Sequence, residues 1–276
     1  MFVKRLIAQL TLVSILGLGI GSIAFGRGMP GPAKHSICVT QQYCLCVTDS
    51  LRALIKKKAA QFRVEIDQAH RKGRMAIYLS VPLTSAAGGY FPLNAEIAHN
   101  ISQKLLKRFG AEAVWVLNPA TPAADLPRNA SQADYMYLWS SVLYGAEKSG
   151  DGVDLVYFAG PDDFGRFFHL DGSDDLGKLS AYFDNREKTD RQFAEMVASG
   201  KLSKAAFLSY YEFRASVAFS AGSHDEWNLV SLINEERRQS GAGIVRQVPV
   251  LFDGGAIAPP LYEASVTPGD TGVCRQ

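Results

Sequence analysis

The sequence predicts a doubly wound α/β fold with a mostly parallel sheet, of the flavodoxin-like or Rossmann-like kind. Short apolar segments alternate with amphipathic segments along the chain, a pattern typical of strands joined by helices. The short segments are continuously apolar, as expected of strands that are covered on both faces. No repeat or second boundary interrupts residues 73–276, so we expect them to form one α/β domain.

Each expected element follows from its own local pattern. Asp49 or Ser50 can cap a first amphipathic helix that Gly73 can end, and Asn94 can cap the second helix. A polar, helical insertion is expected over about residues 162–206. We expect strands at 75–82, 113–119, 153–161, 215–219 and 244–254, further helices at 133–145 and 220–240, and irregular chain at 27–47 and beyond 255.

The N-terminus predicts export. Lys4 and Arg5 precede a long apolar run, and Ala24 and Gly26 fit a signal-peptidase site, so residues 1–26 are expected to be a signal peptide and residues 27–72 a cysteine-containing segment with a helix. The alternative is an uncleaved anchor, which would be the protein's contact with a membrane. Without residues 1–26 the chain has 27 basic and 27 acidic residues, a balance that gives no indication of nucleic-acid binding.

The chain has four cysteines, an even number that suits disulfides in an exported protein. Three pairings are open. Cys44 and Cys46 are too close in sequence for an easy mutual bridge, so a bond from one of them to Cys274 would join the two ends of the domain. A metal site that includes His35 is the alternative, but its spacing matches no standard zinc pattern, and we expect no metal.

Candidate site residues lie in the loops that follow the expected strands, because ligands of open α/β sheets bind beyond the carboxyl ends of the strands. Ser223, His224 and Asp225 are adjacent in sequence and therefore do not form a catalytic triad, which needs separate segments. Helix capping explains one acid in such a turn, but a histidine and two carboxylates crowd this one. The candidates are Tyr78, Gly89, Asp162, Asp163, His224, Glu226, Trp227 and Asn228.

Two stretches resemble nucleoside 2-deoxyribosyltransferases and their relatives. "MAIYLSVPL" is similar to the first strand of that family, and the segment "AGSHDEWNLVSLINEERRQSGAGIVRQVPVLFDG" to its later helix and strand. In the family a Gly-Ser or Gly-Thr turn leads to a glutamate at a helix start, here Gly222, Ser223 and Glu226. The insertion, the residues His224 and Asp225 before the glutamate, and the export signal depart from the family pattern.

The resemblance implies an exported enzyme that cleaves or exchanges an N-glycosidic bond of a nucleoside, nucleotide or NAD, without a cofactor. Glu226 would be the nucleophile, and Asp162, Asp163 or His224 the acid that protonates the leaving base. Tyr78 and Trp227 would orient the substrate, together with Gly89, Asp162 and Asn228. The alternative is a non-catalytic exported protein that binds a small ligand or has a structural role in the cell envelope.

Overall fold

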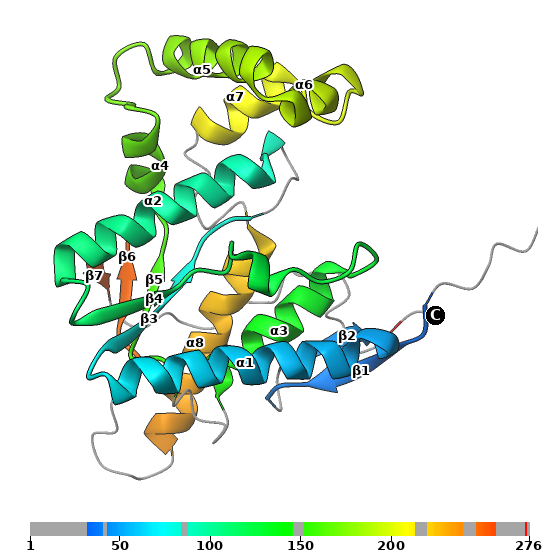
Figure 1. The fold of residues 1–276 in the computed structure, drawn as a ribbon, viewed down its shortest axis with the longest axis vertical. Coiled ribbons are helices and arrows are strands. Elements are labelled where there is room, and N and C mark those ends of the chain that lie inside the picture. The colour runs from blue at the N-terminus through cyan, green and yellow to red at the C-terminus, as the bar shows by residue number, and fades with distance from the viewer. Residues whose placement is uncertain are drawn as a thin grey trace, which may run out of the picture. The chain divides into compact units, whose positions relative to one another are not determined.

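Five strands form the main sheet, and four of them are parallel (Figure 1). The computed structural model describes residues 32–40, 43–83, 88–145, 152–212, 220–239, 247–257 and 274. The strand order is β4-β3-β5-β6-β7, with only β7 antiparallel to its neighbour. The strands are β3 (Met75–Ser80), β4 (Val114–Leu117), β5 (Leu155–Phe158), β6 (Val250–Phe252) and β7 (Gly255–Ile257). The doubly wound α/β prediction is confirmed.

Helices cover both faces of this sheet, because successive strand residues point to opposite sides. Tyr78 and Phe158 belong to a core shared with α1 (Arg52–Arg71), α3 (Gln132–Tyr144) and α8 (Ala221–Gln239). Ile77 and Tyr157, one residue away from them, belong to the core on the opposite face. That second core includes side chains of α2 (Phe91–Phe109) and α4 (Pro161–Phe167).

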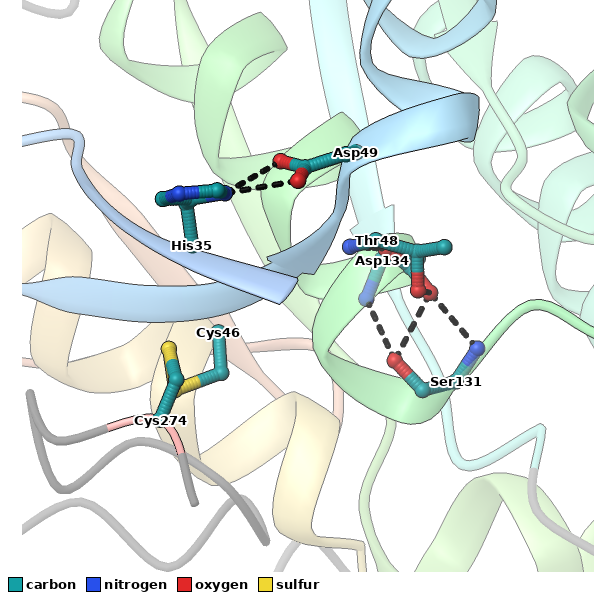
Figure 2. Close-up of a disulfide and its surroundings, with 7 residues drawn as sticks. All are labelled: His35, Cys46, Thr48, Asp49, Ser131, Asp134 and Cys274. Carbon is teal, nitrogen blue, oxygen red and sulfur yellow. Dashed lines mark hydrogen bonds and ion pairs between the residues drawn. A yellow bond between two sulfur atoms is a disulfide. The ribbon is translucent and has the colours of Figure 1, made fainter. Parts of the chain in front are cut away.

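An antiparallel hairpin precedes α1, where the sequence suggested irregular chain. Strand β1 (Lys34–Cys38) pairs with β2 (Cys44–Thr48), and η1 (Asp49–Leu51) leads from β2 into α1. Figure 2 shows how Asp134, in the first turn of α3, holds β2. Its buried carboxylate accepts hydrogen bonds from the Thr48 N–H and hydroxyl, at 2.8 and 2.9 Å, and from Ser131, which caps the helix. The same carboxylate therefore starts α3 and joins it to the hairpin.

Both pairs of cysteines form disulfides. Cys38 and Cys44 are direct partners across the hairpin, and Cys46 is bonded to Cys274 (Figure 2). The expected bond from this segment to Cys274 is thus confirmed, with Cys46 as the partner. Among the described residues, no group of three or more metal-ligating side chains is placed to hold a metal ion.

The helical insertion is present and has its own aromatic core. It comprises α4, α5 (Asp175–Thr189), α6 (Arg191–Ala198) and α7 (Lys204–Glu212). Phe183, Phe193 and Phe207 are buried and meet mostly edge to face, with ring centroids 5.0–5.8 Å apart. Gly88 is pressed against this layer, since a Cβ there would lie 2.1 Å from the carbonyl oxygen of Ala206.

Several boundaries differ from those expected. Helix α2 begins at Phe91, so Asn94 lies inside it, where its side chain accepts a hydrogen bond from Tyr211 instead of capping the helix. The turn at Asp253 and Gly254 returns the chain into β7, where irregular structure was expected. The expected signal peptide, the whole of the expected strand at 215–219 and most of the tail lie outside the described residues. In the part that is described, no helix is long and apolar enough to cross a membrane.

Candidate active site

A cavity lies beyond the carboxyl end of β3, where the connections of neighbouring strands diverge. From β3 the chain passes through α2 to β4, whereas from β5 it continues toward β6 on the other side, so β3 and β5 flank the switch point at which open α/β sheets bind ligands. The cavity has a volume of about 330 Å³, within the range of small-molecule sites. Its described lining comes from the ends of β3 and β4 and from α2, α3 and the start of α8.

Glu226 and Tyr78 meet at this cavity. Glu226 lies in the second turn of α8, is 6% exposed and lines the cavity. The hydroxyl of Tyr78, on β3, donates a hydrogen bond of 2.5 Å to its Oε1 atom. The two residues are 148 positions apart, and the fold brings them together because Tyr78 points toward the face that α8 covers.

The surroundings of Glu226 favour its protonated form. Burial raises the pKa of the carboxyl from 4.5 to about 7, the neighbouring hydroxyls of Ser80 and Tyr78 oppose this rise, and the charge of Asp225 adds to it. Burial and the proximity of Glu226 also raise the pKa of the Tyr78 phenol well above its usual value, so Tyr78 remains a donor. Glu226 can therefore both accept and give a proton near neutral pH.

The other walls are mainly apolar and aromatic, with a few polar groups. Trp139 and Tyr135 of α3 face the cavity, and the Trp139 ring also packs edge-on against Tyr78 at a centroid distance of 6.0 Å. Ser223, one turn before Glu226, is 2% exposed, and its hydroxyl has no hydrogen-bond partner among the described residues. The remaining described lining residues are Val81, Leu83, Phe91, Pro119, Ala124, Asp125, Gln132, Met136, Ser220 and Gly222.

The other predicted residues of α8 are close in sequence to Glu226 but do not line the described cavity. His224 is half-buried, and its backbone N–H donates to the Ser220 carbonyl. His224 therefore lies in the first turn of the helix and not in a turn that precedes it. Trp227 packs against Phe158 with ring centroids 5.0 Å apart, and Asn228 is fully buried. The helical rotation of 100° per residue thus separates them from the cavity.

Asp163 and Asp162 lie apart from Glu226. Asp163 is buried and accepts hydrogen bonds from Tyr157, at 2.7 Å, and from Lys104 of α2, at 2.7 Å, so it belongs to the opposite face of the sheet. Asp162 is exposed at the start of α4. The carboxylate of Asp253 accepts the backbone N–H groups of Asp162 and Asp163, at 2.8 and 2.9 Å, and thereby occupies this helix N-terminus itself.

Gly89 also lies apart from the cavity, next to residues that contact the helical insertion. Its neighbour Tyr90 donates from its hydroxyl to Asp190 of the insertion, and the Tyr90 N–H donates to the hydroxyl of Tyr211. Gly89 is buried between this contact and the close approach of Gly88 to α7. Of the eight predicted site residues, the structure brings Tyr78 and Glu226 together at the cavity and places the other six elsewhere.

Sequence reasoning missed several lining residues. Tyr135 and Trp139 lie on a helix that was predicted only for its core packing, and Trp139, which is 5% exposed, both packs in the core and lines the cavity. Asp125 and Gln132 flank the start of α3, and their position after the second strand of the sheet was the signal that could have identified them. Comparison of the chain with protein-family models, curated proteins and solved structures finds no match.

Proposed function

We propose that this protein is an enzyme that cleaves or exchanges an N-glycosidic bond of a nucleoside, nucleotide or NAD. One observation carries the proposal: Glu226 is a buried carboxyl with a pKa of about 7, oriented by Tyr78, at a ligand-sized cavity beyond the strand ends. Burial with a raised pKa adds no stability to a carboxyl that has only a structural role. Carboxyls that react with a substrate, in contrast, are found in buried sites that shift their pKa.

The chemistry requires a carboxylate below the anomeric carbon. As the bond from that carbon to the base breaks, its electron pair leaves with the base, which takes a proton from water, and the carbon becomes oxocarbenium-like. The ionised fraction of Glu226 bonds to this carbon or stabilises its charge, and the Tyr78 hydroxyl holds the attacking oxygen in position. Water or a second base then releases the sugar, which gives hydrolysis or transfer. The rings of Trp139 and Tyr135 offer apolar surface for the base.

The test is turnover with a matched pair of variants. The protein is incubated with nucleosides, deoxynucleosides and NAD, and released or exchanged base is measured by mass spectrometry. Glu226→Gln should reduce the rate by at least a thousandfold while the fold is retained. Glu236→Gln is the control, because Glu236 is also on α8 and also accepts from a tyrosine, Tyr144, at 2.7 Å, but outside the cavity. A folded Glu226→Gln protein with full activity would refute the proposal.

The hydroxyl of Ser223 is buried and has no hydrogen-bond partner in the described part of the chain, which favours a second candidate, a protein that binds a small polar ligand without reaction. Thermal stabilisation by a member of the same substrate panel, with no product from the wild type, would support this function. A cavity that gives neither response would leave a structural role in the envelope.

We further propose that the protein acts after export. The apolar run after Lys4 and Arg5 supports this, and so do the two disulfides, which persist in oxidising compartments. N-terminal sequencing of the protein recovered from the envelope and culture medium tests it. A mature chain that starts near residue 27 is expected, and an intact Met1 in a purely intracellular pool would contradict the proposal.

A further inference from the structure

The basic charge of this protein is concentrated on one helix. Residues 52–74, which comprise α1 and the turn after it, contain eight lysines and arginines and two acids, Glu65 and Asp67. The rest of the chain contains 21 basic and 25 acidic residues. The near-neutral total thus conceals a segment with a net charge of +6 in a protein that is otherwise acidic, an asymmetry typical of a surface that binds an anionic partner.

Several of these cations have no counter-charge within the described ranges of the chain. Lys58 donates to the carbonyl of Ala123, and Arg74 lies 3.8 Å from Glu112. In contrast, among the described residues, no hydrogen bond or ion pair engages the side chains of Lys56, Lys57, Arg71 and Lys72, all of which are exposed. Positions 56 and 71 share the outward face of α1 and are about 22 Å apart along its axis. Asp67 is the exposed acid between them.

The export proposed above indicates which anionic partner this face meets, and the inference rests on that proposal. The Asp49 N–H donates to the carbonyl of Ala33 at 3.0 Å, so residue 33 lies beside the start of α1. The hairpin β1–β2 is at the same end of α1 (Figure 1). The hairpin therefore lies at the start of the basic helix, while the side chains of Lys56, Lys57, Arg71 and Lys72 remain exposed. An exported protein meets the anionic phospholipid headgroups of the membrane that it crosses, and these form an extended negatively charged surface.

We propose that the exposed face of α1 binds the anionic phospholipid headgroups of a membrane. Lysines close to an anionic bilayer are attracted to it without inserting, and the attraction falls off within a Debye length. The contact needs no membrane-spanning helix. The described lining of the cavity contains no residue of α1, so the proposed contact uses a different part of the molecule.

The experiment compares the full chain with two quadruple variants in co-sedimentation with vesicles. One set of vesicles contains phosphatidylcholine alone and the other contains 30% phosphatidylglycerol. The test variant changes Lys56, Lys57, Arg71 and Lys72 to glutamine. The control variant changes four exposed cations elsewhere, Lys107, Arg128, Lys188 and Lys201, to glutamine and has the same net charge. Circular dichroism melting verifies that both variants fold.

We expect the wild type to bind anionic vesicles at least tenfold more tightly than neutral ones, and this preference to vanish at high salt. The test variant should lose the preference and the control should keep it. Binding to neutral vesicles reports any contribution of the N-terminal apolar run, which is the same in all three proteins. Equal losses in both variants, or no anionic preference in the wild type, would overturn the proposal. Tighter binding to a DNA or RNA oligonucleotide than to anionic vesicles would overturn it as well. If the variants do not fold, the salt dependence of the wild type alone decides the question.

Discussion

The hydroxyl of Tyr78 lies 2.5 Å from Oε1 of Glu226, and this contact joins the central strand β3 to helix α8 at the wall of the cavity. Both groups are buried, and neither has a cation beside it to offset the cost of a carboxylate, as far as the described residues extend. A buried acid of this kind reduces stability when it ionises. The contact therefore links the proposed chemistry to measurable effects on folding.

Replacement of Glu226 by glutamine should stabilise the protein at neutral and alkaline pH. The folded-state pKa of about 7 lies above the ordinary value of 4.5, so as pH rises through this window the unfolded state loses its proton first and the wild type loses stability. The loss is complete above pH 7 and amounts to about 3 kcal/mol. Glutamine retains an acceptor for Tyr78 and does not ionise.

Urea denaturation of both proteins from pH 4 to 9 measures this effect. The gain of the variant should be small near pH 4 and reach its full size above pH 7. Glu236→Gln is the control, because it makes the same substitution in the Tyr144–Glu236 pair, which lies outside the cavity. A gain that does not change with pH would show that ionisation of Glu226 is not its cause.

Replacement of Tyr78 by phenylalanine should raise the pKa of Glu226 further. The hydrogen bond from Tyr78 stabilises the carboxylate and partly offsets the effect of burial, so its loss favours the protonated form. The carboxylic C=O stretch, taken as an infrared difference from the matching Glu226→Gln protein, gives the midpoint of titration. The midpoint should move to higher pH, whereas Tyr144→Phe should leave it in place. A midpoint that moves to lower pH would contradict the assigned direction of the hydrogen bond.

The sequence was sufficient to predict the sheet and its helices, because each element carries its own periodic pattern. It predicted α1 and α8 closely, since their apolar residues recur at helical spacing. The hairpin was missed because its stability comes from distant partners: Thr48 is held by Asp134, 86 residues away, and Cys46 by Cys274. Neither contact leaves a local signal in residues 27–47.

The site was predictable in its centre and not in its surroundings. Tyr78 and Glu226 were both identified, one from the end of a strand and one from a crowded helix start. The face on which a strand-end residue lies depends on register, which local sequence does not reveal. Tyr157 points to the face of the sheet opposite Glu226, where its hydroxyl donates a hydrogen bond to Asp163. Phe158, the next residue, points to the face that α8 covers and packs against Trp227.

The two disulfides should contribute unequally to stability. In the chain-entropy model the contribution grows with the length of chain that a bond closes. The Cys46–Cys274 bond closes 228 residues and the Cys38–Cys44 bond closes six, which corresponds to about 5 and about 2 kcal/mol. Thermal melting of the double Cys→Ser variant of each pair measures the difference, and each variant is the control for the other. The order would be contradicted by a larger loss in the Cys38–Cys44 variant.

Gly160 should not tolerate a side chain, because the turn after β6 lies directly against it. A Cβ at residue 160 would be 2.4 Å from the Cβ of Asp253, whose backbone has a φ of 54° and whose carboxylate holds the N–H groups at the start of α4. An alanine must therefore displace the Asp253 turn and weaken both hydrogen bonds, at a cost of about 2 kcal/mol or more. Gly152→Ala is the matched control, since a Cβ there meets its nearest neighbour at 3.6 Å, and its effect should stay within about 0.5 kcal/mol. Urea denaturation compares the two, and a Gly160→Ala protein as stable as Gly152→Ala would mean that the turn at Asp253 adapts without loss of its contacts to α4.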